Sequence, residues 1–529
     1  MFRRDFLKVA PSSFATALLP GVDAEKPASA SSGPRAIAIN VLDFGALGDG
    51  KNLDSPAINR AIEAAALSGG GTVYFPAGTY LSYTLRLKSH INLHLDSGAT
   101  ILAASVPSEG TATGGYDPAG PKQPWEAFQD FGHNHWANSL IYGEDLEYVS
   151  ISGSGLIWGK GLSRGMQDEL PLAESPGVGN KAIALKKCRN VSLRDFSILS
   201  GGHFAILLTG VDNVLIDGLT LDTNRDGIDI DCCRNVRVSN CIVNSPWDDG
   251  IVPKSSFALG EARATENLLI TNCHVTGAYV IGTLLDGTLK PIVYPDWRKP
   301  IGRIKCGTES NGGFKNITIA NSIFDTCRGL ALLVVDGGVL EDVSINNLTM
   351  RNVNHPPLTL RLGQRMSGPN KKPAGALRRV RISQIVSSNA SAEFCSIIAG
   401  VPGMPIEDVS VSDVFFEQAG GGTEAWAQRK PPEKADGYPD ADMFGISPAS
   451  GFFIRHAKNI QLNNVEIAVR QPDQRAAIWA SEVDGLDVFR LKAPSSAPCF
   501  SLDRITNLRT SNTWDRPDRF SKEIITETF

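Results

Sequence analysis

A short pattern of apolar and polar positions recurs along the chain from about residue 147. Each copy starts at a turn residue, alternates apolar, polar and apolar side chains, and ends at Gly, Asn or Asp. This alternation predicts β-strands with one buried face. The clearest copies are Asn190-Val191-Ser192-Leu193, Asn213-Val214-Leu215-Ile216, Asn235-Val236-Arg237-Val238, Asn267-Leu268-Leu269-Ile270 and Asn316-Ile317-Thr318-Ile319.

The copies return at a nearly constant interval. Asn190, Asn213 and Asn235 are 23 and 22 residues apart, and we read the 49 residues from Asn267 to Asn316 as two such intervals. A fixed period of this length, with no helical stripe between copies, predicts an all-β solenoid, the single-stranded parallel β-helix. A β-sandwich or propeller would need hairpins with two-residue turns, and those signals are sparse.

The repeated asparagines have a structural explanation. Asparagine tolerates left-handed backbone angles, and its amide can hydrogen-bond the same residue in the next coil. We therefore interpret them as a ladder that stabilises the corners of the coils.

A helix is expected ahead of the repeats. Asp54-Ser55-Pro56 supplies a capping residue and a proline for the first turn, and Gly69-Gly70-Gly71 ends the segment. Such a helix would cover the end of the solenoid, where core and strand edges are otherwise exposed. The apolar residues at helical spacing are Ile58, Ala61, Ile62 and Ala65.

Composition narrows the class of protein. The 529 residues are 42% hydrophobic and 20% charged, which excludes disorder for the bulk of the chain. With 51 basic and 56 acidic residues, the net charge of −5 argues against a nucleic-acid partner. None of the nine cysteines lies in a C-x-x-C pair, so zinc is not indicated and we expect neither metal nor cofactor. Buried small residues in stacked coils explain the cysteines better than a disulfide framework does.

The first residues predict export. Arg3-Arg4-Asp5-Phe6-Leu7-Lys8 precedes an apolar run from Val9 to Leu19 that is too short to span a bilayer, which is typical of a twin-arginine signal. We expect residues 1–30 to be signal peptide and linker and residues 36–529 to form the β-helix catalytic domain. The mature protein would then be periplasmic or secreted and free of the membrane.

Three aspartates are predicted to meet on one face of the solenoid. Asp226 precedes Asp248 by 22 residues and Asp249 by 23, which is one repeat. Because successive coils stack at roughly 4.8 Å, these carboxylates should be neighbours. Carboxylates held that close shift one another's pKa, so that one can act as an acid while another stays ionised. Paired carboxylates around a scissile bond hydrolyse glycosides, but the register leaves a retaining and an inverting geometry open.

Other charged residues near this cluster are more ambiguous. Asp229 and Asp231 are as well explained by a calcium site or by turn acids as by catalysis. Arg303 and Lys305, two residues apart and two coils beyond Asp248 and Asp249, would share one side of a strand and could bind a sugar carboxylate. On composition alone, a surface charge pair explains them better.

These motifs resemble the polygalacturonase family, glycoside hydrolase family 28. The shared segments are Asn224-Arg225-Asp226-Gly227-Ile228-Asp229, Asp248-Asp249 and Arg303-Ile304-Lys305. The resemblance implies a right-handed parallel β-helix and hydrolysis of pectic polymers with inversion. It implies that Asp248 is the general acid, that Asp226 and Asp249 activate water, and that Arg303 and Lys305 bind the sugar carboxylate. Asn224 and Lys254 are further candidates for substrate binding.

The sequence departs from the family pattern at two points. The family's Asn-Thr-Asp reads Asn224-Arg225-Asp226, which adds a cation beside a carboxylate. The family's Gly-His-Gly motif contains a histidine that assists near the general acid. The corresponding segment here is Gly277-Ala278-Tyr279, so this histidine is missing. His203 and His274 are nearby in sequence but not at the motif position.

We therefore expect a glycosidase acting on a galacturonan or rhamnogalacturonan chain or oligosaccharide. Two insertions, residues 105–137 and 159–181, are long enough to be functional loops and favour attack from a chain end. A β-helical lyase, with Arg303 or Lys305 as base and the acids holding calcium, is an alternative. A non-catalytic carbohydrate-binding or adhesin-type solenoid is another.

Overall fold

The computed structural model describes residues 38–105, 115–130, 133–164, 175–291, 299–369, 375–495 and 497–529. Both the export signal and the linker expected at residues 1–30 lie outside this part of the chain. In the described part, no helix is long and apolar enough to cross a membrane.

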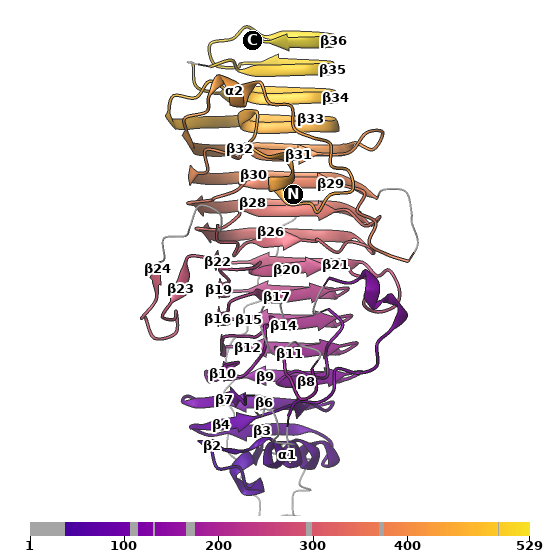
Figure 1. The fold of residues 1–529 in the computed structure, drawn as a ribbon, viewed down its shortest axis with the longest axis vertical. Coiled ribbons are helices and arrows are strands. Elements are labelled where there is room, and N and C mark those ends of the chain that lie inside the picture. The colour runs from indigo at the N-terminus through magenta and orange to yellow at the C-terminus, as the bar shows by residue number, and fades with distance from the viewer. Residues whose placement is uncertain are drawn as a thin grey trace, which may run out of the picture. The chain divides into compact units, whose positions relative to one another are not determined.

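The strands of residues 38–529 form a parallel β-helix, as predicted (Figure 1). Each early coil contributes one strand to each of three stacks. The first stack, which carries the candidate site, contains β5 (Leu85–Arg86), β8 (Ile141–Glu144), β11 (Lys181–Lys186), β14 (Phe204–Thr209), β17 (Asp226–Asp231), β20 (Ile251–Lys254), β25 (Ile304–Cys306), β27 (Leu330–Val334), β29 (Leu358–Leu362) and β31 (Ser396–Ala399).

The other two stacks complete the coils. The second contains β1 (Ala38–Asn40), β3 (Gly71–Phe75), β6 (Ile91–Leu95), β9 (Glu147–Ser152), β12 (Arg189–Arg194), β15 (Asp212–Asp217), β18 (Arg234–Ser239) and β21 (Thr265–Thr271). The third contains β2 (Asp49–Leu53), β4 (Gly78–Ser82), β7 (Ala99–Ala103), β10 (Leu156–Trp158), β13 (Ser197–Leu199), β16 (Thr220–Asp222), β19 (Ile242–Asn244) and β22 (His274–Thr276).

Later coils use longer strands that bend through the corner between the second and third stacks. For example, β26 pairs with both β21 and β22. The long strands are β26 (Phe314–Asp325), β28 (Val339–Arg351), β30 (Ala376–Ala390), β32 (Ile406–Gly420), β33 (Ala449–Gln471), β34 (Ala476–Lys492) and β35 (Phe500–Ser511). An antiparallel strand, β36 (Arg519–Thr528), pairs with β35 at the C-terminal end (Figure 1). A small separate hairpin joins β23 (Tyr279–Ile281) and β24 (Lys290–Pro291).

Aligned aliphatic side chains build the core. Val191, Val214, Val236 and Leu268 occupy one position in successive coils and are buried. Burial of such a stack, at roughly 25 cal/mol per Å² of apolar surface, is what holds one coil on the next. All nine cysteines are free and buried, in agreement with the packing interpretation.

The predicted asparagine ladder is confirmed. Asn190, Asn213, Asn235, Asn267 and Asn316 all have a positive φ of 55° to 58°. From Asn213 onward, each amide nitrogen donates to the side-chain oxygen of the preceding asparagine at 3.0 Å. We call these five residues the asparagine ladder.

The reading of the 49-residue interval was wrong. Leu268 of β21 pairs directly with Ile317 of β26, so Asn267 and Asn316 are one coil apart. The extra residues lie between β22 and β25, in an excursion that includes the β23–β24 hairpin. An insertion lengthens the sequence interval without adding a coil.

The predicted helix is present as α1 (Ser55–Leu67), at the N-terminal end of the solenoid (Figure 1). Its expected apolar residues are buried. Asp54 occupies the N-cap but does not cap through its side chain. Its carboxylate instead accepts the N–H groups of Leu47 (2.7 Å) and Gly48 (3.1 Å), and so fixes the preceding turn.

Candidate functional site

The three aspartates do come together. Asp226 is the first residue of β17, and Asp248 and Asp249 lie in the turn that leads into β20. Ile228 of β17 pairs with Ile251 of β20, which brings Asp226 and Asp249 to matching positions of adjacent coils. One carboxylate oxygen from each of the three lies within 4.8 Å of the others. Asp226 Oδ1 also accepts the backbone N–H of Asp249 at 3.0 Å.

Two cations hold Asp249 in its ionised form. Arg303 Nε donates to Asp249 Oδ1 at 2.7 Å, and Lys305 Nζ is paired with Asp249 Oδ2. Burial opposes the charge on Asp249, but Lys305 and Arg303 more than offset it and lower its pKa below the usual range. Asp249 is therefore an anion at neutral pH.

Arg303 and Lys305 are one coil beyond Asp248 and Asp249, not two as the sequence interval suggested. Their strand, β25, pairs with β20 through Ile304 and Ile251. The error has the same origin as the misread asparagine interval, since the excursion between β22 and β25 precedes them. Both side chains do lie on the face that carries the aspartates.

Asp248 is the most exposed of the three carboxylates, with 24% of its side chain accessible. Burial, the neighbouring charge of Asp226 and that of Asp249 raise its pKa, while Arg225 and Lys305 oppose them. The net effect is a pKa of about 7. A carboxyl group that keeps its proton to near neutrality suits a general acid.

Lys254 lies beneath the cluster and does not offer a free charge to solvent. It is buried, and its Nζ lies 3.3 Å from Asp226 Oδ2 and 3.2 Å from Asp229 Oδ1. Burial disfavours the ammonium, but Asp229 and Asp226 outweigh it and raise the pKa of Lys254. The structure thus places this predicted substrate ligand as a counter-charge for two aspartates.

The remaining predicted acids differ from one another. Asp231 is fully buried and accepts the backbone N–H of Ser256 at 2.8 Å and its hydroxyl at 2.6 Å, which is a structural role. Asp229 faces Lys254, as described above. Asn224 is half-buried in the turn before β17, and its carbonyl accepts the N–H of Trp247 at 3.0 Å.

A histidine that sequence reasoning did not assign lies near this network. His133 is buried, contacts Glu309 and has its Nε2 3.9 Å from Asp229 Oδ1. Burial and Lys254 lower its pKa to about 3, so it is a neutral imidazole. His203 Nδ1 lies against the backbone carbonyl of Arg164, and His274 is the first residue of β22. No local motif marks His133, because a loop brings it to the site.

Three loops from distant parts of the chain converge beside the cations. We call residues 115–130 the first loop, residues 363–368 the second and residues 421–448 the third. Arg365 of the second loop bonds Asp130 of the first at 3.2 Å, and Gln364 N–H donates to the carbonyl of Ala435 in the third at 2.6 Å. The third loop includes α2 (Glu424–Ala427) and the short 3₁₀ segment Ala441–Phe444.

The third loop reaches the cations themselves. Its Tyr438 hydroxyl accepts a hydrogen bond from Thr308 at 3.0 Å, and its Asp440 lies 3.9 Å from Arg303 Nη2. Tyr438 is 55% exposed. Asp130 N–H in the first loop donates to Glu309 Oε1 at 2.8 Å, so the first and third loops flank the strand end that carries Lys305.

Two groups of side chains in the described structure have metal-ligating atoms close enough to share an ion: the three aspartates, and His355 with Asp440 and Asp442. In the first, Arg225, Lys254, Arg303 and Lys305 already supply positive charge to the carboxylates. In the second, Arg328 is paired with Asp440. Side chains therefore supply the counter-charges that a cation would supply.

Comparison with known proteins supports the β-helix fold. Residues 38–252 match the family model described as rhamnogalacturonase A/epimerase, pectate lyase-like, and residues 174–355 match the model for a right-handed β-helix region. The chain is 22% identical over 409 residues to a probable polygalacturonase from Vitis vinifera, covering 73% of this chain and 75% of that one.

In sequence and in fold, the chain is similar to polygalacturonases. Its fold is the right-handed parallel β-helix that the resemblance implied.

Two further likenesses are more limited. The crystal structure of a hyperthermoactive exopolygalacturonase from Thermotoga maritima superposes with a TM-score of 0.56 at 18% identity, covering 82% of this chain and 92% of that one. The plasmin and fibronectin-binding protein A of Streptococcus pneumoniae is 35% identical over 188 residues, which is 34% of the polygalacturonase-like chain and 23% of the other.

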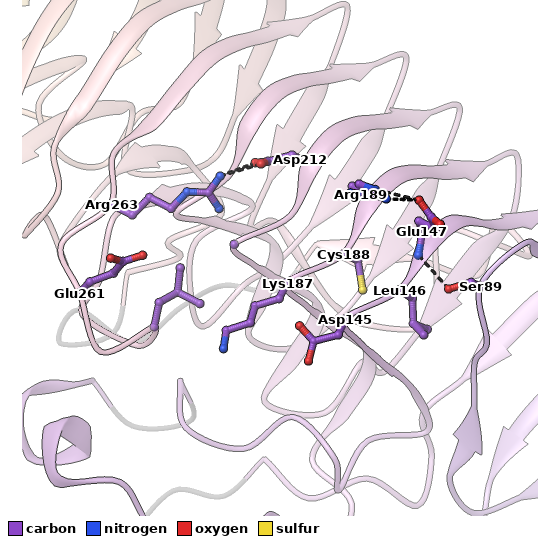
Figure 2. A pocket seen from close by; sticks show the side chains of 12 residues that line it. Ser89, Asp145, Leu146, Glu147, Lys187, Cys188, Arg189, Asp212, Glu261 and Arg263 are labelled. Atoms are coloured by element: carbon purple, nitrogen blue, oxygen red, sulfur yellow. Dashed lines mark hydrogen bonds and ion pairs between the residues drawn. The ribbon is translucent and has the colours of Figure 1, made fainter.

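A polar cavity of about 610 Å³ opens elsewhere on the polygalacturonase-like chain (Figure 2). Asp145, Lys187, Glu261 and Arg263 are among its lining residues, and none of the three clustered aspartates lines it. Arg263 there bonds both carboxylate oxygens of Asp212 at 2.7 Å. Arg263 and Asp212 therefore form an ion pair that is separate from the aspartate cluster.

Proposed function

We propose that this protein is a glycoside hydrolase that cleaves a pectic polysaccharide or oligosaccharide, of galacturonan or rhamnogalacturonan type. The observation that carries the proposal is that the site shifts the pKa values of two adjacent carboxyl groups in opposite directions. The pKa of Asp248 is raised to about 7, and that of Asp249 is lowered. A proton donor beside a permanent anion is what acid–base hydrolysis of a glycoside needs.

In the proposed reaction, Asp248 gives its proton to the glycosidic oxygen as the bond between that oxygen and the anomeric carbon breaks. A water molecule held by Asp226 and Asp249 attacks the anomeric carbon and passes its proton to one of these carboxylates. Transfer of a proton to Asp248 and loss of one from the base restore the starting state. Arg303 and Lys305 would contribute their remaining N–H donors to the sugar carboxylate.

We propose inversion at the anomeric carbon. The short separation of the carboxylate oxygens taken alone would favour a covalent route, since inverting enzymes typically separate them by about 6.5–9.5 Å. However, both oxygens of Asp249 are bound by cations, and those of Asp226 face the Asp249 N–H and Lys254. Oxygens held in this way are poor nucleophiles but can still orient a water molecule.

We also propose that the protein attacks the polymer from a chain end. The three loops meet around one side of the cations, through Asp130, Arg365, Gln364 and Tyr438. Loops joined in this way would stop a long polymer from continuing past the site. We further propose export to the periplasm or outside the cell, on the basis of the paired arginines at residues 3 and 4.

Two other functions serve as alternatives in the test. A lyase would need Arg303 or Lys305 as a base, but Asp249 outweighs burial and raises the pKa of both, so both hold their protons. A binding role without turnover draws support from the local likeness to the streptococcal binding protein. That likeness spans a small part of the streptococcal chain.

Purified protein incubated with galacturonan and rhamnogalacturonan oligosaccharides of defined length tests the proposal. We expect new reducing ends, sugar units released one at a time or in short steps from one end, and a product anomer opposite to the cleaved linkage by ¹H NMR. Asp248→Asn is the control for contaminating activity. An unsaturated product would establish the lyase, and tight binding with no product across the panel would establish the binding protein.

A further inference from the structure

Arg225, the residue that departs from the family's Asn-Thr-Asp, lies against the proposed acid. Its Nη2 donates to Asp248 Oδ2 at 2.7 Å. The other oxygen, Asp248 Oδ1, accepts the N–H of Asp249 at 3.1 Å. Each oxygen of the carboxyl group thus has one fixed partner, and the orientation of the group depends on Arg225.

The backbone holds Arg225 at this place. Its carbonyl accepts the hydroxyl of Ser245 at 2.6 Å, and the preceding carbonyl of Asn224 accepts the N–H of Trp247 at 3.0 Å. These two bonds join the turn before β17 to the turn that carries Asp248. The guanidinium and the carboxyl group therefore belong to one rigid pair of turns.

The hydrogen-bond donors of Arg225 are used less fully than those of Arg475. Arg475, which is fully buried, places Nε and Nη2 on Asp473 at 3.0 and 2.6 Å and Nη1 on the carbonyl of Ser447. The Nε of Arg225 is buried and has no hydrogen-bond partner among the described residues. An unpaired buried donor costs free energy, so the bond to Asp248 satisfies the guanidinium of Arg225 less fully than Asp473 and Ser447 satisfy that of Arg475.

Resting on the proposed function, we infer that Arg225 is the positioning residue of the catalytic acid Asp248. It acts in a chain whose Gly277-Ala278-Tyr279 lacks the histidine found near the acid in the family. Arg225 fixes the direction in which Asp248 presents its proton, and its charge limits how far the neighbouring carboxylates raise the affinity of Asp248 for that proton.

The charges that face Asp248 determine the sign of the expected effect. Asp226 and Asp249 raise its pKa in addition to burial, and Arg225 and Lys305 lower it. Removal of the Arg225 charge takes away the largest of the charges that oppose the rise, and Lys305 continues to oppose it. The pKa of Asp248 should then rise, and the acid should stay protonated to higher pH.

The test compares Arg225→Gln and Arg225→Lys with the wild type in kcat, KM and the pH dependence of kcat/KM. Arg225→Gln should lower kcat about 10- to 100-fold through misorientation. It should also shift the basic limb of the profile upward by about one pH unit. Arg225→Lys keeps the charge, so its basic limb should stay at the wild-type position while kcat falls less.

Arg263→Gln is the matched control. Arg263 and Arg225 have similar exposure, 15% and 18%, and each is paired with one aspartate. We expect Arg263→Gln to lower the melting temperature without moving the pH profile. If Arg225→Gln behaves in the same way, with a lower Tm and an unshifted basic limb, Arg225 is structural and the inference is wrong.

A second measurement separates this inference from the proposed function. If the wild type hydrolyses no pectic substrate, the proposed function fails, but the coupling of Arg225 to Asp248 can still be measured. Infrared difference spectra against Asp248→Asn isolate the carboxyl band of Asp248 without turnover. An upward shift of its titration midpoint in Arg225→Gln supports the coupling, and an unchanged midpoint overturns it.

Discussion

The asparagine ladder and the aspartate cluster are built by the same coil geometry. In both, side chains one coil apart are brought close together, as in Asn213 with Asn235 and Asp226 with Asp249. In the ladder, each amide donates to its neighbour and accepts from the next, so the stack is neutral and satisfied. In the cluster, the stacked groups are acceptors of like charge.

This difference distinguishes the ladder, which stabilises the fold, from the cluster, whose charged groups are suited to chemistry. A carboxylate stack cannot satisfy itself, so it depends on Arg225, Lys254, Arg303 and Lys305. These cations are unevenly distributed. At Asp249, Lys305 and Arg303 outweigh burial and lower the pKa. At Asp248, burial and the charges of Asp226 and Asp249 outweigh Arg225 and Lys305 and raise the pKa, so the two values move apart.

The largest effect expected from breaking the cluster is loss of catalysis in Asp248→Asn. The amide keeps the shape of the side chain but has no acidic proton to give, so kcat should fall by about 10²- to 10⁴-fold. Reducing-sugar release measures the loss, and circular dichroism and Tm confirm the fold. Activity within a few-fold of the wild type would remove Asp248 from the mechanism.

The next effect concerns stability. Asp249→Ala leaves Arg303 and Lys305 buried without their shared anion, which should lower the free energy of unfolding by about 3–5 kcal/mol. Urea denaturation measures it. Adding Lys305→Met should recover part of the loss, because one unpaired charge is then removed. A double variant less stable than Asp249→Ala would contradict this account.

A third prediction concerns pH. Asp248 must be protonated to act, and its pKa is about 7, so kcat/KM of the wild type should be retained below that pH and fall about tenfold per unit above it. Asp249, with its lowered pKa, stays ionised on the acidic side. A pH–rate profile measures both the retained activity below pH 7 and the fall above it. Activity that keeps rising from pH 7 to 9 would be inconsistent with Asp248 as the acid.

The smallest effect is expected in the ladder. Asn235→Gly keeps a residue suited to the φ of 57° and removes two exposed amide hydrogen bonds, at a cost of about 1 kcal/mol. Asn235→Ala should cost about 1 kcal/mol more because of its left-handed backbone. Both should keep full kcat. A large loss of activity in Asn235→Gly would mean that ladder and site are coupled.

Much of this comparison could be predicted from the sequence, because stacking converts spacing along the chain into proximity. Intervals of 22 and 23 residues identified both the ladder and the meeting of Asp226 with Asp249. The same rule failed from Asn267 to Asn316 and for Arg303, where an excursion from the coil adds residues but no coil.

Contacts made by loops could not be predicted from the sequence. The sequence around His133, Asp130 or Tyr438 does not indicate where their loops lie, because those positions depend on packing against coils far away in the chain. Lys254 was read as a substrate ligand, but its position beneath Asp226 and Asp229 depends on which side chains of two strands face each other. The sequence shows that Arg225 departs from the family's Asn-Thr-Asp motif. It does not show that Arg225 forms a hydrogen bond with Asp248.

The measurement that tests the central claim most directly is the titration of Asp248 in the wild-type protein. Infrared difference spectra between the wild type and Asp248→Asn, recorded from pH 4 to pH 9, report the protonation of this one carboxyl group. The account predicts a midpoint near pH 7. A midpoint near 4, the ordinary value for an exposed aspartate, would contradict the claim that the stacked coils turn neighbouring carboxylates into an acid and a base.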